Sequence, residues 1–374
     1  MNDLSFVGPL IRLHRLKNNW SQATLCSGIC AVSYLSKIEK GRVLPNEELL
    51  KDLVSRLGLV WHTDKKDREL CERIYEAIFA WDNAQLQELL MQLNFYLEQS
   101  KISIFHLDLI VAKAYLSNDC KLIPDEMIDL LTGRQRCLYA ILQGEHDLAF
   151  HCYPCALSAY CVAEEAYCKG NYTYALEYLN TAYEKASQNG FVYIMMICQS
   201  CMANCYSDIG NMEAMQRHSF IARRIAQALG DSNILNTIDY NLAATELEHG
   251  NVSKAYAYFS ALDDHSVMSL HKLAICCELM DKTDEALSAL DRAVSNECAD
   301  SMELEMCDLV RYRIVHRDYL QDATYCNKLM TLFNAIETRR HHGYARFHLP
   351  WVLEYLKTNR KYKEAYELML SFTK

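Results

Sequence analysis

The chain has 374 residues, of which 51% are hydrophobic, and its net charge at pH 7 is −10. This length exceeds what one compact core accommodates, so two or more units are expected, and the apolar content excludes extensive disorder. With only 12 glycines and 5 prolines, the composition favours a mostly helical chain with short turns.

No apolar run approaches the length needed to cross a bilayer, and charged residues interrupt any signal-like segment near the N-terminus. We therefore expect a cytoplasmic protein with no membrane contact. The charge is divided unevenly: residues 1–60 carry eight Lys and Arg against five Asp and Glu, and residues 61–374 sum to −13. Because phosphate contacts need cations, a mildly basic head on an acidic body suits DNA binding by the head alone.

The stretch from residue 21 to residue 41 is typical of two short helices joined by a tight corner, the layout of a DNA-reading helix-turn-helix. Ser21 is a good N-cap for the first helix. Each of the two helices carries a pair of apolar residues on one face. These four residues are expected to pack against three leucines of the preceding helix. These core residues are Leu25, Ile29, Leu35 and Ile38, with Leu10, Leu13 and Leu16.

Polar and basic residues remain on the outer face of the second helix and on the turn after it, a hydrogen-bonding surface suited to a major groove. The DNA-binding candidates on this surface are Ser33, Tyr34, Ser36, Lys37, Lys40 and Arg42. Pro45 and Asn46 open a further helix, expected from Glu47 to Leu57. We predict a DNA-binding domain over residues 1–62; the alternative is a helical hairpin that serves only dimerisation.

The segment resembles the N-terminal domain of the Cro/repressor-type helix-turn-helix family, and most closely the pheromone-controlled regulators of Gram-positive bacteria, the Rgg–NprR–PlcR–PrgX group. The resemblance implies a helix-turn-helix domain of the five-helix type, an ion pair between Arg15 and Glu39, and a contact of Gln22 with a DNA phosphate. Cys30 stands where many members of the wider family carry a glycine at the corner. The shared residues, without a gap, are Ser21, Gln22, Leu25, Ile29, Cys30, Ser33, Ser36, Lys37, Ile38, Glu39, Gly41 and Pro45.

The chain contains 17 cysteines, which in a large chain without a secretion signal do not indicate a disulfide framework. Many fall at helical core positions, where cysteine behaves as a small hydrophobe. The best metal candidate is the pair Cys152 and Cys155 with His146 and His151 close by, but a structural zinc site needs a second ligand pair, and the sequence supplies none. We predict no metal and no cofactor; a redox role of Cys152 and Cys155 stays open.

After residues 61–64, interpreted as a hinge, the sequence repeats itself. A Gly-Asn pair at 170–171 returns at 210–211 and 250–251, each 40 residues after the last. Later turns follow at residues 281–282, 317–318 and 359–360. Small residues recur early in the helices after these turns, because the two helices of a hairpin approach closely; these are Ala175, Ala255, Ala286, Ala323 and Ala365.

This pattern resembles the tetratricopeptide repeat, with longer and looser copies than its usual period. We therefore predict an all-α protein in which residues 63–374 form a degenerate tetratricopeptide-like α-solenoid, right-handed, with a concave groove lined by the first helix of each pair. The same region is expected to sense a peptide and to form the dimer. Residues 67–150 show helical periodicity with weaker repeat signals.

An extended peptide exposes N–H and C=O groups, and an Asn amide can donate and accept to one peptide unit at once. Asn204 and Asn241 lie on first helices, and Tyr240 precedes Asn241 as in the peptide-clamping positions of the pheromone receptors that the chain resembles. If Asn204 is displaced by one helical turn, Ser200 takes its role. Lys272 is a candidate for binding a carboxylate. Weaker candidates for the groove are Gln199, Tyr167 and Arg311.

The sequence contains no Gly-rich phosphate loop, His-Glu-x-x-His motif or nucleophile elbow, so no enzyme is predicted. The prediction is a transcription regulator whose operator binding is controlled by a short signalling peptide. The resemblance implies a homodimer on an operator with two half-sites. The alternatives are a repeat scaffold that binds a protein partner and keeps a vestigial head, or a regulator that senses a protein or a small metabolite.

Overall fold

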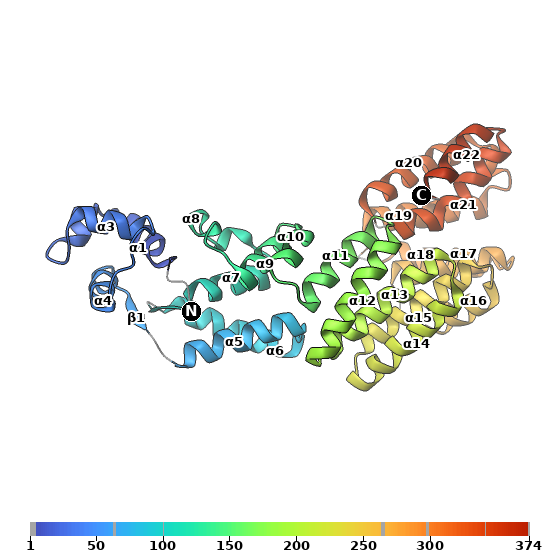
Figure 1. Ribbon diagram of the computed structural model, residues 1–374. Helices are drawn as coiled ribbons and strands as arrows, with labels where there is room; N and C mark the ends of the chain where they lie inside the picture. Colours follow the sequence, from blue (N-terminus) through green and yellow to red (C-terminus); the bar gives the residue numbers. More distant parts are fainter. Residues whose placement is uncertain are drawn as a thin grey trace. The chain divides into compact units, whose positions relative to one another are not determined.

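The computed structural model describes residues 5–62, 65–99, 101–262, 266–296, 299–340 and 342–372 (Figure 1). Contacts within the chain divide it into two units, residues 1–162 with 180–195, and residues 163–179 with 196–374. The boundary passes through the helices α11 (Ala156–Cys168), α12 (Tyr172–Asn189) and α13 (Val192–Ile209). The domain boundary predicted between residues 62 and 63 stays a prediction.

The other elements of the first unit are listed here in chain order, with η marking a 3₁₀ helix: α1 (Val7–Lys17), α2 (Gln22–Cys26), α3 (Val32–Glu39), α4 (Glu47–Arg56), β1 (Val60–His62), α5 (Lys65–Ala80), α6 (Asn83–Glu98), β2 (Lys101–Ser103), α7 (His106–Leu116), η1 (Cys120–Leu122), α8 (Asp125–Ile128), α9 (Gly133–Leu142) and α10 (His146–Cys152).

The elements of the second unit that follow α13 are α14 (Met212–Leu229), α15 (Ser232–Glu248), α16 (Val252–Ala261), α17 (Val267–Leu279), α18 (Thr283–Val294), α19 (Ser301–Val315), η2 (Tyr319–Gln321), α20 (Ala323–Arg339), α21 (His342–Thr358) and α22 (Tyr362–Ser371). The prediction of an all-α, tetratricopeptide-like solenoid is confirmed, with one short departure. The strands β1 and β2 pair in parallel, with Val60 opposite Lys101 and His62 opposite Ser103.

This strand pair corrects the predicted hinge. Trp61 and His62 belong to β1 and are hydrogen-bonded to β2, so they are not part of a free linker. The other two predicted hinge residues, 63 and 64, lie outside the described residues. Helices α1 to α4 fall before this point, and the next helix along the chain, α5, begins at Lys65, beyond the predicted domain boundary.

The helix starts in the head follow from its capping residues. The Ser21 hydroxyl accepts a hydrogen bond from the Thr24 backbone N–H at 3.0 Å, and the Asn46 side chain accepts one from Leu49 N–H at 2.9 Å. Each cap satisfies a backbone donor that has no partner inside its helix. Between α2 and α3 the chain turns at Gly28, whose φ of +72° suits glycine. The corner glycine missing at residue 30 is thus supplied two residues earlier.

The core of the head contains most of the predicted residues. Leu10, Leu25, Leu35 and Ile38 are buried, together with Phe6 and Val7 before them and three residues of α4 (Leu50, Leu53 and Val54). For three residues the prediction of a core position is wrong, because none of them is fully buried. Ile29 is half-buried because α2 ends at Cys26, before Ile29 is reached; Leu13 is half-buried; and Leu16, in the last turn of α1, is 47% exposed.

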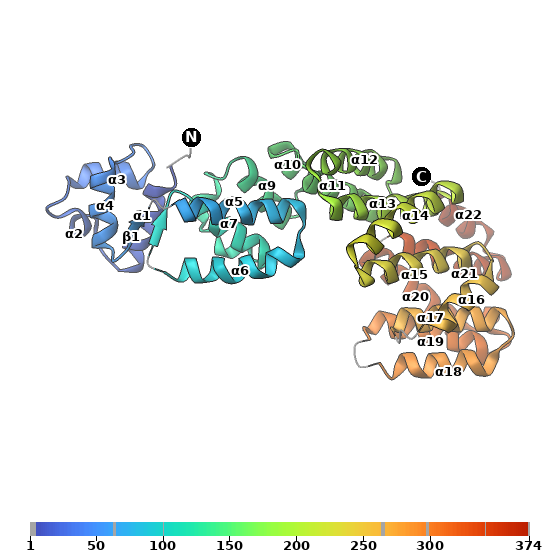
Figure 2. The ribbon, with the colours of Figure 1, turned by 90° about the horizontal axis from the view of Figure 1, so that it is seen from below.

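The Gly-Asn pairs of the array lie at turns between helices, as the repeat predicts. Gly210 and Gly250 have φ values of +82° and +79°, and Asn211 caps α14 by accepting from the Ala214 backbone N–H at 3.1 Å. The predicted small residues are each the fourth residue of their helix, and all are buried; they are Ala175, Ala255, Ala286 and Ala365. Figure 2 shows α17, α18 and α19 packed side by side.

Ala323 is the exception among the small residues. It is exposed because α20 begins at this residue, so that the fourth position of the helix falls on Cys326. The short 3₁₀ helix η2 before α20 shifts the helix start relative to the preceding turn. Ala323 therefore does not mark a close helix–helix contact.

Candidate functional site

An ion pair fixes the helices of the head. The Arg15 guanidinium donates to Glu39 through Nε–Oε1 at 2.6 Å and Nη2–Oε2 at 2.9 Å, and its Nη1 donates to the Trp20 carbonyl at 2.7 Å. Both side chains are buried. A two-pronged pair of this kind sets orientation as well as distance, so it locks α1 against the end of α3. The pairing implied by the resemblance is confirmed.

Gln22 belongs to the same network. Its side-chain amide donates to Glu39 Oε2 at 2.8 Å, which occupies the amide nitrogen inside the domain. The predicted contact of Gln22 with a phosphate stays a prediction. Arg56, which sequence reasoning did not single out, donates from α4 to the carbonyls of Leu25 at 3.1 Å and of Ser27. A cation at the end of α2 also suits the negative end of the helix dipole.

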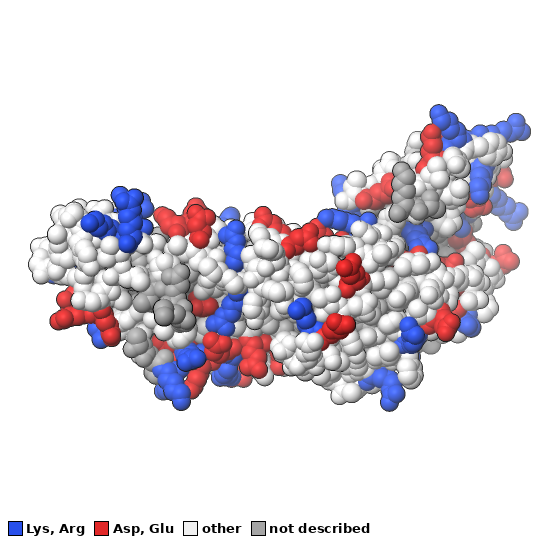
Figure 3. Space-filling model, viewed as in Figure 1, with Lys and Arg blue, Asp and Glu red and all other residues white. Residues whose placement is uncertain are grey.

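The predicted DNA-binding face is accessible. Ser33, Lys37, Lys40 and Arg42 are exposed, and Tyr34 and Ser36 are half-buried. Ser33, Ser36 and Lys37 are three or four residues apart along α3, which places them on neighbouring positions of one side, and Lys40 and Arg42 follow the end of the helix. In Figure 3, Lys and Arg side chains gather over the part of the surface where α1 and α3 lie in Figure 1. This surface has the charge and the hydrogen-bonding groups that a DNA duplex requires.

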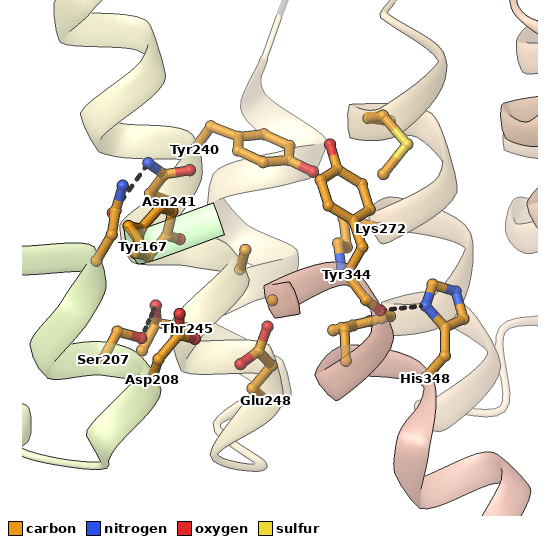
Figure 4. A pocket seen from close by; sticks show the side chains of 15 residues that line it. Tyr167, Ser207, Asp208, Tyr240, Asn241, Thr245, Glu248, Lys272, Tyr344 and His348 are labelled. Atoms are coloured by element: carbon orange, nitrogen blue, oxygen red, sulfur yellow. Dashed lines mark hydrogen bonds between the residues drawn. The ribbon is translucent and has the colours of Figure 1, made fainter. Parts of the chain in front are cut away.

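The second candidate site is a cavity of about 200 Å³ within the second unit (Figure 4). Its walls come from α11, α13, α15, α17 and α21, which are first helices of their pairs, whereas α19, the first helix between α17 and α21, contributes no lining residue. The residues that line it are Tyr167, Asn204, Ser207, Asp208, Tyr240, Asn241, Ala244, Thr245, Glu248, Met268, Lys272, Gly343, Tyr344, Phe347 and His348.

Two polar pairs link the walls formed by α13 and α15. The Asn241 amide donates to Asn204 Oδ1 at 3.2 Å, and the hydroxyls of Ser207 and Thr245 lie 2.9 Å apart. The asparagine pair uses one donor and one acceptor, which leaves the Asn204 amide nitrogen and the Asn241 carbonyl oxygen for a peptide unit. The structure thus brings together the two asparagines that the sequence singled out.

Two carboxylates lie beside these pairs. Burial raises the pKa of Asp208 to about 6, and it also raises the pKa of Glu248, with Lys272 and Arg346 acting against it. Asp208 Oδ2 is buried and has no hydrogen-bond partner among the described residues. Sequence reasoning missed both acids. The available signal was their spacing, because Asp208 follows Asn204 by four residues and Glu248 follows Asn241 by seven, which places each on the same helix face.

A basic and aromatic wall lies on α17 and α21. Lys272 is 6% exposed, and its Nζ lies 2.8 Å from the centroid of the Phe347 ring. Burial lowers the pKa of Lys272 to about 7, and the nearby charge of Glu248 opposes this shift. His348, also missed from the sequence, binds the Tyr344 carbonyl through Nδ1 at 2.8 Å. Gly343, Tyr344, Phe347 and His348 of α21 join Tyr167 of α11 in one cavity although they follow it by at least 176 residues in the sequence.

Three predicted groove residues lie elsewhere. The Gln199 side chain accepts from His218 Nδ1 at 2.7 Å, so it faces α14. Arg311 pairs with Asp291 at 2.6 Å, between α19 and α18. Ser200 is half-buried and does not line the cavity, and since Asn204 does, the one-turn displacement that would have used Ser200 does not occur. Tyr167, Tyr240 and Lys272 do line the cavity.

In the part of the chain that the structure describes, no three His, Cys, Asp or Glu side chains gather in a way that could bind a metal ion. The helices described there are all too short or too polar to cross a membrane.

Comparisons with known proteins bear on both regions. Residues 11–60 match the family model described as Helix-turn-helix. The chain is 26% identical to the transcriptional activator NprA of Geobacillus stearothermophilus over 293 residues, which cover 66% of this chain and 68% of NprA.

Two solved structures are also similar. The Rap protein complexed with competence and sporulation factor matches with a TM-score of 0.65 at 17% identity, covering 83% of this chain and 97% of Rap. The apo form of the quorum sensor NprR from B. thuringiensis matches with a TM-score of 0.44 at 13% identity, covering 95% and 99%. The shared fold rests on the Rap structure.

The matched N-terminal domain and the repeat array define the class of this protein by its architecture, a helix-turn-helix head followed by a tetratricopeptide-like body. Within that class it is similar to NprA, and the resemblance to the Rgg–NprR–PlcR–PrgX group that its sequence indicates is confirmed.

Proposed function

We propose that this protein is a cytoplasmic regulator whose binding to DNA is controlled by a short signalling peptide held in the cavity of the array. The observation that carries the proposal is the cavity itself, in which Asn204 and Asn241 meet on two first helices and leave one donor and one acceptor unused. A small rigid ligand does not need such a pair, whereas every unit of an extended peptide presents one N–H and one C=O.

The other walls indicate which peptides fit. The Oδ2 atom of Asp208 is buried without a partner among the described residues, and the pKa of this carboxyl stays raised although the charge of Arg346 acts against burial, so a cationic group of the peptide would relieve its desolvation. Lys272 offers the opposite charge to a carboxylate, and Tyr240, Tyr344 and Phe347 supply apolar surface around it. A peptide with both a cationic and an acidic group could pair with Asp208 and with Lys272 at the same time. The Rap structure, of similar fold, is itself complexed with competence and sporulation factor.

The head supplies the second activity. Its exposed residues Ser33, Lys37 and Arg42 would contact a major groove and its phosphates, and NprA, the relative in sequence, is a transcriptional activator. A homodimer would place two heads on two half-sites. For the peptide to switch DNA binding, it must bind one arrangement of the heads more tightly than the other, by roughly 5.5 kcal/mol for a nearly complete switch.

A gel-shift of the purified protein on the DNA upstream of its own gene tests this proposal, run with and without the small-peptide fraction of spent medium. The expected result is a shifted band that the fraction strengthens or weakens and that the Lys37→Ala variant does not give. A band that ignores the fraction would replace the peptide with a protein or a metabolite as effector. The absence of any band at low salt would favour the scaffold, with a head that no longer binds DNA.

A further inference from the structure

A second cavity in the second unit adjoins the first and is not used by the proposed function. Its volume is about 310 Å³, and three of the residues that line it, Ser207, Glu248 and Phe347, also line the first cavity. Ligand pockets usually measure roughly 300–1,000 Å³, which exceeds the volume of about 200 Å³ of the first cavity. A peptide held by the asparagine pair therefore needs further room, and the adjoining cavity offers it.

The second cavity has an apolar wall on α15, α17 and α21. Leu247 and Ile275 are buried in this wall. The Trp351 ring lies edge to face with that of Phe347, and the ring centroids are 6.0 Å apart. Leu279 lines the same cavity and is 54% exposed, although burial of a leucine side chain is favourable. An apolar side chain of a ligand would cover Leu279 and remove further apolar surface from water.

Arg346 of α21 is the arginine that lines this cavity. It is half-buried, and among the described residues its guanidinium has neither a hydrogen bond nor an ion pair. Other arginines of the second unit are paired: Arg223, Arg313 and Arg340 each bond to a carboxylate. A guanidinium presents five N–H donors in a planar arrangement that matches the two oxygens of a carboxylate. Arg346 therefore offers a carboxylate site that the described residues do not fill.

The acids near Arg346 do not occupy this site. The charge of Arg346 acts against the raised pKa of Asp208 and of Glu248, so its charge reaches both carboxyls although it bonds to neither. The other cation of the two cavities, Lys272, already lies over the Phe347 ring. A ligand carboxylate in the second cavity would bond directly to Arg346, and without Arg346 the charge of Glu248 would repel it.

We propose, on the basis of the peptide-binding function proposed above, that the second cavity binds the C-terminus of the peptide. Arg346 donates to the terminal carboxylate, and the apolar wall holds the side chain of the last residue. Only the last residue of a peptide carries a main-chain carboxylate and an apolar side chain on one Cα, so one residue meets both features. An acidic side chain would pair with Arg346 but leave the wall uncovered. The preceding residues then contact the asparagine pair, and the cationic group lies at Asp208.

Affinity selection with two synthetic hexapeptide pools tests this assignment. The pools contain the same random sequences and differ only at the C-terminus, which is a free carboxylate in one and a carboxamide in the other. Each pool is incubated with the full-length protein, the complexes are separated by gel filtration, and mass spectrometry quantifies and sequences the bound peptides. We expect the wild type to retain free acids at least about tenfold better than amides, because a charge-assisted bond is lost with the carboxylate. Apolar last residues should be enriched among them.

Two variants and a matched control assign the preference to residues. Arg346→Gln should still bind peptides but lose the preference for free acids, and its circular dichroism should stay native because no bond to a described residue is lost. The control Arg217→Gln changes an exposed arginine of α14, a helix that lines neither cavity, and should keep the preference. Leu279→Ser should weaken the selection for an apolar last residue and keep the selection for a free acid.

The outcomes separate this inference from the proposed function. Asn241→Ala should lower the recovery of both pools alike and leave the ratio of free acid to amide unchanged. Equal retention of the two pools by the wild type, or a preference for free acids that survives in Arg346→Gln, would overturn the C-terminal assignment while peptide binding stands. No retention of peptides from either pool would overturn both.

Discussion

The helix-turn-helix head and the cavity of the array differ in how far their buried polar groups are hydrogen-bonded. In the head, Arg15 and Glu39 are buried, and the guanidinium makes three hydrogen bonds at 2.6 to 2.9 Å. In the cavity, Asp208 and His348 each bury a polar atom without a partner among the described residues, and Lys272 is buried over an aromatic ring. Because native proteins satisfy most of their buried polar groups, the head is complete by itself, whereas the peptide that we propose would supply partners in the cavity.

The largest effect that this comparison predicts is in the head. Arg15→Ala leaves Glu39 buried without its cation, which typically costs about 3–5 kcal/mol, and DNA binding should be lost with the fold of the head. Hydrogen exchange of the amides in α1 to α4 measures this loss. The control Lys51→Ala removes an exposed ion pair with Glu47 and should cost less than about 0.5 kcal/mol. Equal costs of the two changes would mean that the buried pair does not hold the head.

In the cavity, replacing a buried charged residue should increase the stability of the fold instead of lowering it. Lys272→Met should raise the stability of the array by on the order of a few kcal/mol at pH 6, because burial disfavours the charged lysine more than the charge of Glu248 stabilises it. The pKa of Lys272 is about 7 in the folded chain and near 10.4 when unfolded, so between these values the unfolded chain binds more protons. Wild-type stability should therefore rise with pH across that window, and the advantage of the variant should shrink.

Thermal unfolding of the two proteins at pH 6, 7.5 and 9 measures this difference. A Lys272→Met variant that is less stable than the wild type at every pH would show that Lys272 is a satisfied structural residue, and the contrast between the head and the cavity would then fail.

Two glycines with positive φ, one in the head and one in the array, allow a comparison of smaller changes in stability. An added Cβ at Gly28, in the corner of the head, meets no atom within 4 Å, so Gly28→Ala should cost about 1 kcal/mol from backbone strain alone. At Gly170, in the array, the same Cβ would lie 3.0 Å from the His342 ring, so Gly170→Ala should cost more. Urea denaturation of both variants measures the two costs, and the reverse order would mean that His342 moves aside.

Local signals in the sequence were sufficient for much of this architecture. Ser21 and Asn46 marked helix starts, the Gly-Asn pairs marked the turns of the array, and small residues marked the fourth position of most second helices. Each of these signals works within a few residues of chain, where capping and backbone conformation decide the structure.

Features that depend on distant parts of the chain were not predictable in this way. The strands β1 and β2 have three residues each, too few to show a period, and their partners are 41 residues apart. The side of α13 that Gln199 occupies is set by His218 on α14. His348 became visible as a site residue only when α21 was seen to share a cavity with α13.

The central claim is that DNA binding and peptide binding belong to two separate regions of one chain. Its most direct test measures both activities in Lys37→Ala and Asn241→Ala, using upstream DNA and the peptide purified from spent medium. We predict a crossed result: Lys37→Ala loses at least about tenfold in DNA affinity and keeps the peptide, whereas Asn241→Ala loses about ten- to hundredfold in peptide affinity and keeps DNA binding. Loss of both activities in either variant, with the fold intact, would contradict the account.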